Sequence, residues 1–212
     1  MAFDHEFYSI ANEVSSESKV KGSRFIAHAC PVESREGAES CIKRLANRFH
    51  DATHNCFAYK IGVGDRADLR FSDAGEPSGT AGRPILQAIE SKNLTNVAVV
   101  VTRYFGGTKL GTGGLIRAYG AVALEALNNA ETVQHFPKIT FRLRFDYQHA
   151  NAVHNVLNRF CGQILESRFD DQTTYLVTVK SADENKVREE LRDISSGKMK
   201  IEVIQERLAS NE

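Results

Sequence analysis

In the second half of this 212-residue chain, segments with apolar residues at every second position alternate with segments that have them at every third or fourth position. No other sequence feature restricts the fold as much. Strands with one buried face repeat their apolar residues every second position, whereas helices repeat them every three to four. The predicted elements are a strand at 139–145, a helix at 153–160, strands at 163–168 and 174–180, a helix at 187–194 and a strand at 199–203. This βαββαβ order is the ferredoxin-like pattern. Pro137 stands at its entrance, so we expect two domains, residues 1–136 and 137–212.

The first half is less regular but also mixes strands and helices. Val97–Thr102 is continuously apolar and rich in β-branched residues, which predicts a buried central strand. The other predicted elements are strands at 21–32, 55–63 and 69–71, helices at 38–49, 84–91 and 115–129, and loops at 72–83 and 106–114. The fold class predicted for the whole chain is therefore α+β.

Composition restricts the class of protein. The chain is 42% hydrophobic and 25% charged, as globular proteins usually are, and no apolar run reaches the length of a membrane span. The N-terminus is acidic and polar where a secretory signal would be basic and then apolar, so we expect a cytoplasmic protein without membrane contact. With 27 basic and 27 acidic residues, any nucleic-acid binding must use a local patch.

Four cysteines, Cys30, Cys41, Cys56 and Cys161, are scattered without a CxxC pair. In a reducing compartment we expect free thiols packed as small hydrophobic side chains. His54 and Cys56 form the one tight His/Cys group, and two ligands do not make a zinc site, so we expect no metal. The same two residues would share a strand face, as in a Cys–His dyad, but core packing is the favoured interpretation.

A glycine-rich stretch, Arg103–Tyr119, follows the predicted central strand and leads into a helix. No Asp or Glu occurs from Ser91 to Leu124. Helix starts offer unpaired N–H groups and a positive dipole end, so this stretch could bind a phosphate or carboxylate. The alternative is that the glycines only form a tight strand-to-helix connection. The candidate binding residues are Arg24, Arg103, Tyr104, Gly106, Gly107, Lys109, Gly111, Gly113, Gly114, Arg117 and Tyr119.

Nucleotide-binding motifs do not match this stretch. Gly106 and Gly111 have the P-loop spacing, but Thr112-Gly113 stands where Lys followed by Ser or Thr is required. The dinucleotide-binding glycine spacing also fits poorly. We therefore expect no ATP or NAD and no other cofactor.

The loop 72–83 carries a second candidate group. Asp73 and Glu76 could act with His54 as an accessory acid–base site. The favoured alternative is structural, with Asp73 closing a turn and Thr80 capping the following helix.

Several of these segments resemble the YigZ/IMPACT family, in the form of its bacterial two-domain members. The matching segments are Lys21-Gly-Ser-Arg-Phe, His54-Asn-Cys, the run from Phe71 to Gly82, the run from Gly82 to Gly111, and the run from Leu110 to Tyr119. The resemblance implies a ribosomal protein S5 domain 2-like N-terminal domain and a ferredoxin-like C-terminal domain similar to elongation factor G domains. It also implies a connection with translation, through a protein partner in eukaryotic relatives and through RNA or the ribosome in bacterial ones. It supplies no catalytic residue.

Three functions stay open. The favoured one is a non-catalytic translation-related regulator that binds RNA or the ribosome through the basic, acid-free glycine stretch. The second is an enzyme acting on a phosphorylated or nucleotide-like small molecule, with His54, Asp73 and Glu76 converging on the glycine loop. The third is a protein-interaction module in translational stress control. The sequence favours a protein without catalytic activity.

Overall fold

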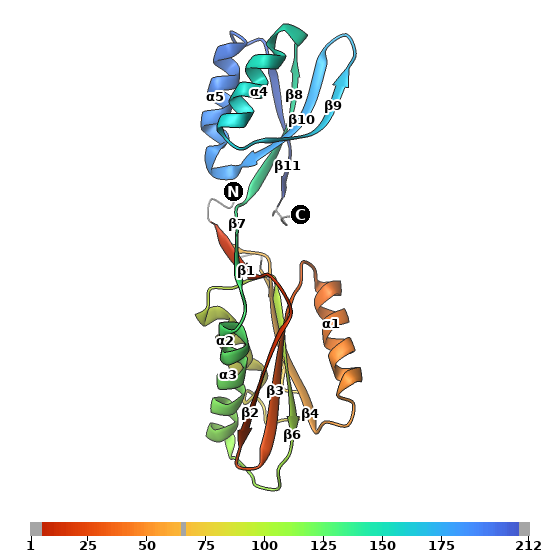
Figure 1. Ribbon diagram of the computed structural model, residues 1–212, viewed down its shortest axis with the longest axis vertical. Coiled ribbons are helices and arrows are strands. Elements are labelled where there is room, and N and C mark those ends of the chain that lie inside the picture. The colour runs from red at the N-terminus through yellow and green to blue at the C-terminus, as the bar shows by residue number, and fades with distance from the viewer. Residues whose placement is uncertain (1–5, 65–66, 208–212) are drawn as a thin grey trace. The chain divides into compact units, whose positions relative to one another are not determined.

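The computed structural model describes residues 6–64 and 67–207 (Figure 1). Their contacts divide into two compact units: the N-terminal unit, Phe7–Gln134, and the C-terminal unit, which consists of Glu6 and the described residues from His135 onward. The sequence-based boundary, between residues 136 and 137, lies close to this division. None of the described helices is long and apolar enough to cross a membrane.

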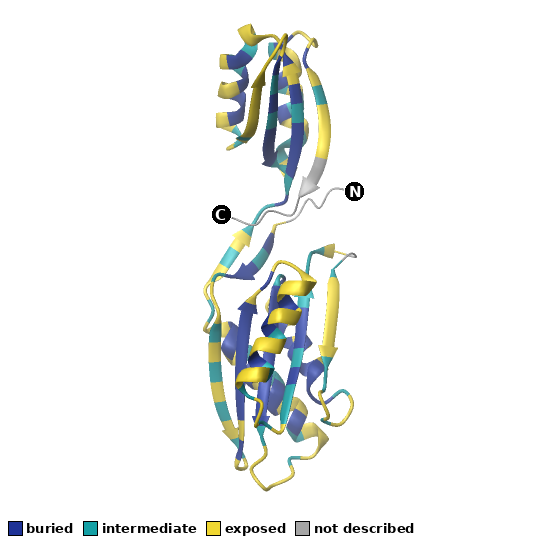
Figure 2. Ribbon diagram, turned by 90° about the vertical axis from the view of Figure 1, so that its right-hand side faces the viewer, coloured by how far each residue is buried: buried dark blue, intermediate teal, exposed yellow. Residues whose placement is uncertain are grey.

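A five-stranded sheet in the order β2-β3-β6-β4-β5 forms the centre of the N-terminal unit. Its strands are β2 (Val14–Val20), β3 (Ser23–Pro31), β4 (His54–Ile61), β5 (Asp68–Ser72) and β6 (Val97–Tyr104). All neighbouring strands are antiparallel. β6 lies in the middle and is almost fully buried (Figure 2), as its apolar run predicts. A separate two-stranded sheet joins β1 (Phe7–Ile10) to β7 (Thr132–His135).

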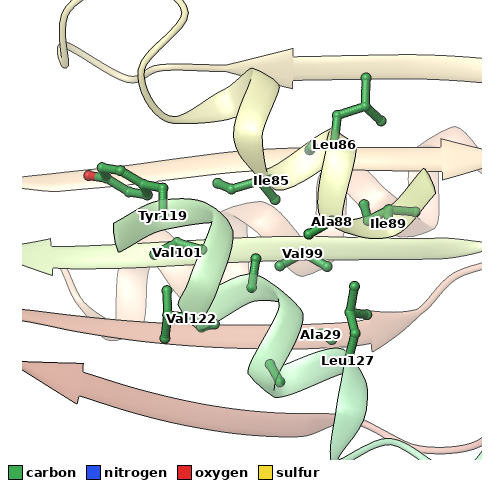
Figure 3. Close-up of a cluster of buried hydrophobic side chains, with 14 of the residues drawn as sticks. Ala29, Ile85, Leu86, Ala88, Ile89, Val99, Val101, Tyr119, Val122 and Leu127 are labelled. Carbon is green, nitrogen blue, oxygen red and sulfur yellow. The ribbon is translucent and has the colours of Figure 1, made fainter. Parts of the chain in front are cut away.

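Helices cover both faces of the five-stranded sheet (Figure 1). α1 (Arg35–Arg48) packs on one face, while α2 (Gly82–Ser91) and α3 (Thr112–Asn128) pack on the other. Alternation along β6 divides its side chains between the faces, with Val99 and Val101 under α2 and α3 and Val100 under α1. Figure 3 shows the larger core, which the two helices on one side close over the strands.

The C-terminal unit has the predicted βαββαβ order. Its elements are β8 (Lys138–Phe145), the 3-10 turn η2 (Tyr147–His149), α4 (Ala150–Arg159), β9 (Gln163–Phe169), β10 (Thr173–Lys180), the 3-10 turn η3 (Ser181–Asp183), α5 (Glu184–Ile194) and β11 (Lys200–Arg207). The four antiparallel strands lie in the order β11-β8-β10-β9. Both helices bury their apolar stripes against one face of this sheet. The mixed α+β class is thus confirmed, and the two fold names implied by the resemblance stay predictions.

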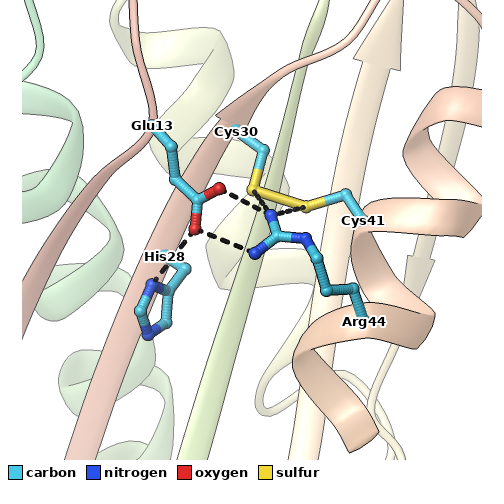
Figure 4. The surroundings of a disulfide bond; sticks show 5 residues. All are labelled: Glu13, His28, Cys30, Cys41 and Arg44. Carbon is cyan, nitrogen blue, oxygen red and sulfur yellow. Dashed lines mark hydrogen bonds and ion pairs between the residues drawn. A yellow bond between two sulfur atoms is a disulfide. The ribbon is translucent and has the colours of Figure 1, made fainter. Parts of the chain in front are cut away.

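The expectation of four free thiols is wrong for one pair, because Cys30 and Cys41 form a disulfide (Figure 4). Cys30 lies on the face of β3 that α1 covers, and Cys41 lies on the buried stripe of α1. This apposition depends on where the helix packs, which residue spacing does not show. Arg44 reaches both sulfur atoms at 3.6 Å and pairs with Glu13. Cys56 and Cys161 are free, as predicted.

Candidate functional site

Motifs that are far apart in the sequence meet at one end of the five-stranded sheet. The strand register places Phe25 of β3 and His54 of β4 on either side of Arg103, near the end of β6. The loop between β5 and α2 brings Glu76 to the same place, and α3 brings Tyr119. We call the five polar side chains that gather here the Glu76 cluster: His54, Cys56, Glu76, Arg103 and Tyr119.

Glu76 is the centre of the cluster. Its Oε1 atom accepts hydrogen bonds from Arg103 Nη1 at 2.6 Å and from the Tyr119 hydroxyl at 2.7 Å. The Glu76 and Arg103 side chains are only 3% and 6% exposed, so this is a buried ion pair. Removing one partner of such a pair leaves an uncompensated buried charge and costs about 3–5 kcal/mol. The pair therefore fixes the loop of Glu76 firmly against β6.

Arg103 points into the protein and is not a surface cation. Its Nη2 atom donates to Ser23 Oγ at 3.3 Å, and its guanidinium lies 5.5 Å from the ring centres of both Phe25 and Phe105. Alternation along β6 puts residue 103 on the same face as Val99 and Val101, under α2 and α3. The expected contact of Arg103 with a bound phosphate therefore has no support in the structure.

Cys56 and Tyr119 lie beneath the ion pair, fully buried. The Cys56 thiol donates to the Asp73 carbonyl at 2.9 Å and lies 3.5 Å from the Tyr119 hydroxyl. Burial raises the pKa of Cys56 to about 12 and also raises the pKa of Tyr119 above its ordinary value. A thiol that stays protonated at neutral pH is a poor nucleophile. Core packing, the favoured interpretation of Cys56, fits this environment.

His54 is the cluster member that reaches solvent, with its side chain 20% exposed. Its Nδ1 atom lies 2.9 Å from the carbonyl oxygen of Ala74. Because a carbonyl can only accept, Nδ1 carries the hydrogen, and Nε2 faces the Glu76 carboxylate at 4.0 Å. Gly75, at φ +89°, lies so close that a Cβ atom there would meet the ring at 3.3 Å.

Asp73 holds the loop and the start of α2 together. Its carboxylate accepts from the amides of Gly79, Ala81 and Gly82 at 2.8–2.9 Å. Burial alone would raise the pKa of Asp73, but the three N–H donors outweigh burial and lower it. The structural interpretation of Asp73 thus fits, whereas Thr80 is not the helix cap: its hydroxyl donates to the Pro77 carbonyl at 2.6 Å.

The glycine-rich loop begins with a close contact between two backbones. A Cβ atom on Gly106 would lie 1.8 Å from the Gly22 carbonyl carbon, so only glycine fits. The Gly106 amide donates to Ser23 Oγ at 3.2 Å, on the same hydroxyl that Arg103 contacts. Gly107 and Gly111, by contrast, have open space around them and adopt φ of +84° and +74°.

The exposed first turn of α3 follows the loop. Gly111 occupies the N-cap position and offers no side-chain acceptor, and the turn contains no acid. Within the described structure, the amides of Thr112, Gly113 and Gly114 have no hydrogen-bond acceptor. The Arg117 guanidinium lies beside this turn, because its Nη1 would be 3.8 Å from a Cβ atom on Gly113. These groups form the candidate anion site.

The remaining predicted residues, Lys109, Arg24 and Tyr104, lie outside the Glu76 cluster. Lys109 is exposed in the loop and, like Arg117, has no ion-pair partner among residues 6–64 and 67–207. Arg24 and Tyr104 lie opposite each other in the register, on the face away from Arg103. Arg24 binds Glu17 with two hydrogen bonds of 2.8 and 2.7 Å, and Tyr104 donates to Asp51 at 2.8 Å. Both are therefore already engaged with carboxylates.

Ser23 is a site residue that the sequence interpretation missed. It joins Arg103 to Gly106 through its hydroxyl, and it lies within the Lys21–Phe25 motif, which could have drawn attention to it. Among the described residues, no group of three or more His, Cys, Asp or Glu side chains is placed to hold a metal ion.

Comparison with known proteins links both units to one family. Residues 21–127 match the Impact N-terminal domain, and residues 143–198 match a domain of unknown function, DUF1949. The IMPACT family member YvyE of Bacillus subtilis is 34% identical over 197 residues, which are 93% of this chain and 90% of YvyE. YigZ of Escherichia coli is 32% identical over 92% of this chain and 97% of its own length.

A more distant relative and a solved structure also match this chain. Human Protein IMPACT is 33% identical over 91 residues, covering 42% of this chain and 28% of that protein. A solved structure titled "Crystal structure of an hypothetical protein" matches 98% of this chain and all of its own, with a TM-score of 0.70 and 30% identity. The chain therefore belongs to the IMPACT family.

Proposed function

We propose that this protein is a non-catalytic, translation-related regulator that binds RNA, free or in the ribosome, through residues 106–114 and the first turn of α3. One observation carries the proposal: three amides without an acceptor among the described residues start a 17-residue helix, the Arg117 guanidinium lies beside them, and exposed Lys109 precedes them in a stretch without a single acid. Membership of the IMPACT family fits a role in translation.

Phosphate is the ligand that this arrangement suits best. Aligned amides at a helix start and the positive end of the helix dipole attract an anion, and a guanidinium can bind a phosphate with two hydrogen bonds. Phe105, at the entrance of the loop, is 48% exposed and offers a surface on which a base could stack. The ligand class is therefore a phosphate chain that also carries bases.

The Glu76 cluster explains how so glycine-rich a loop keeps one shape. Arg103 precedes the loop and Tyr119 follows it, and both donate to the same oxygen of Glu76. A third hydrogen bond, from the Gly106 amide to the Ser23 hydroxyl, holds the start of the loop. Because both flanks are fixed to buried groups, the free amides are ordered before any ligand binds, which lowers the entropic cost of binding.

The experiment is a binding titration of the full chain with a labelled single-stranded RNA across a salt series. Lys109→Ala with Arg117→Ala removes two phosphate contacts, and each contact contributes about 0.7 to the slope of log affinity against log salt. We expect the slope to fall by about 1.4. The matched control, Lys43→Ala with Arg48→Ala on α1, removes equal charge elsewhere and should leave the slope unchanged. A slope that is equal in both variants contradicts the proposal.

A second candidate, an enzyme acting on a phosphorylated small molecule, is favoured by the pairing of His54 with Glu76. His54 Nε2 and the Glu76 carboxylate lie 4.0 Å apart, close enough for one water beside them to donate a hydrogen bond to each. Against it, Asp73 is used in capping and Glu76 is neutralised by Arg103. Turnover of phosphorylated small molecules that His54→Gln abolishes, with RNA binding intact, would establish the enzyme.

A further inference from the structure

The C-terminal sheet has one face that its helices leave open. Phe141, Leu143 and Val177 point into the core formed with α4 and α5. Because side chains alternate along a strand, the even-numbered residues of β8 and β10 point to the opposite face. No helix of the described part of this unit packs there; this face is exposed at Arg144, whereas Thr140 on the same face is buried.

One line of residues across this open face is positively charged. The register joins Lys200 of β11 to Arg144 of β8, Arg144 to Thr174 of β10, and Thr174 to Arg168 of β9. We call these four residues the cationic row. It runs across all four strands with three cations, one hydroxyl and no carboxylate.

The fold does not neutralise this row. Like charges directly opposite each other destabilise a sheet, yet Lys200 and Arg144 are neighbours and neither has an ion-pair partner among the described residues. Arg168 approaches Glu166 at 3.7 Å, but the two side chains are 74% and 60% exposed, and such a pair contributes little. An arrangement that costs stability without internal compensation points to an external anion.

The positively charged area is only one row of residues wide. Two residues along the strands, about 6.8 Å away, the next row contains Glu202, Arg142, Leu176 and Glu166 and is net acidic. A groove of about 370 Å³ lies between the rows and is also lined by Asp170. A flat anionic surface such as a membrane would cover these acids together with the cations, whereas a linear anion that crosses the strands along the cationic row lies closest to its three cations.

We propose that the cationic row binds the phosphate backbone of an extended single-stranded nucleic acid that crosses the sheet perpendicular to its strands. The choice of nucleic acid among linear polyanions rests on the proposed function, but the row itself does not. Arginines can bind successive phosphates with paired hydrogen bonds, and Thr174 adds a hydroxyl donor. The even-numbered positions of β8 and β10 include no aromatic residue on which a base could stack, so binding there is independent of base sequence.

The test uses the full chain, a fluorescein-labelled 20-nucleotide oligouridylate and fluorescence anisotropy from 50 to 200 mM salt. Arg144→Ala with Arg168→Ala should weaken binding about 25-fold at 0.1 M salt and lower the salt slope by about 1.4, because two phosphate contacts are lost. The control, Lys186→Ala with Arg192→Ala on α5, removes equal charge from the helical side and should change neither value. Both pairs are exposed, and melting curves should confirm that each variant folds.

The outcomes separate this proposal from the previous one. Loss of affinity in the row variant but not in the loop variant Lys109→Ala with Arg117→Ala would support the row and overturn the loop. The reverse result would overturn the row alone, and absence of RNA binding by the unmodified chain would overturn both. Binding to phosphatidylserine vesicles that depends on Arg144 and Arg168, without such dependence for RNA, would overturn the choice of nucleic acid.

Discussion

The buried pair of Glu76 and Arg103 makes the sharpest prediction about stability. Arg103→Met removes the cation from a carboxylate that is 3% exposed, and among the described residues the Tyr119 hydroxyl is then its one remaining hydrogen-bond donor. An unpaired buried charge costs about 3–5 kcal/mol, so the free energy of unfolding of the N-terminal unit should fall by that amount. Urea unfolding followed by circular dichroism measures the loss, and hydrogen exchange of the β6 and α3 amides assigns it to this unit.

A triple variant provides the control that isolates charge burial. The triple variant Arg103→Met, Glu76→Leu and Tyr119→Phe replaces the three hydrogen-bonded members of the Glu76 cluster by apolar side chains of similar size, and such replacements are often neutral or stabilising. We expect it to be more stable than Arg103→Met alone. If the triple variant is as unstable as the single one, or if the single variant loses less than about 1 kcal/mol, the ion pair does not hold this site together.

Three further predictions concern single residues of the site. Cys56, with its pKa raised to about 12, should resist thiol reagents at pH 8 in the native protein, while exposed Cys161 reacts; rapid labelling of Cys56 would contradict its placement. Asp73→Ala should cost about 0.5–2 kcal/mol at pH 7, and because the folded pKa of Asp73 is lowered, the difference from the unmodified protein should persist above about pH 4 and shrink as the pH falls below it. Urea unfolding at pH 7 and pH 3 tests this sign, and an equal difference at both values refutes it. Gly106→Ala should cost more than about 3 kcal/mol because its Cβ would overlap Gly22, whereas Gly107→Ala, in open space at positive φ, should cost about 1–2 kcal/mol; equal melting temperatures would refute the close contact.

Periodicity in the sequence was enough to predict most of the fold. The βαββαβ order of the C-terminal unit and the central position of β6 follow from apolar repeats alone. β2 was missed because only Val14 and Val20 at its ends are apolar, and an edge strand needs little burial. α3 begins three residues before the predicted start. The prediction left Gly113 and Gly114 out because glycine has low helix propensity, but packing of the helix overrides this propensity.

Sequence motifs named the residues that meet in the Glu76 cluster, but they did not show how these residues are arranged. The motifs pointed to His54, Glu76 and Arg103, yet β6 is buried on both faces, so its apolar run cannot show to which side residue 103 points. That Glu76 becomes the partner of Arg103 depends on how the loop 72–83 folds back over the sheet, a contact between residues 27 positions apart. Long-range pairing of this kind leaves no local pattern.

In the proposed function, the amides at the start of α3, which have no acceptor among the described residues, receive a phosphate of RNA. Nitrogen-15 NMR of the full chain during titration with a single-stranded oligouridylate observes those amides directly. We expect the signals of Thr112, Gly113 and Gly114 to move downfield and to saturate with the binding curve. Lys109→Ala with Arg117→Ala should weaken these shifts. If the signals stay in place while RNA binds, the ligand lies elsewhere and these amides do not bind the phosphate.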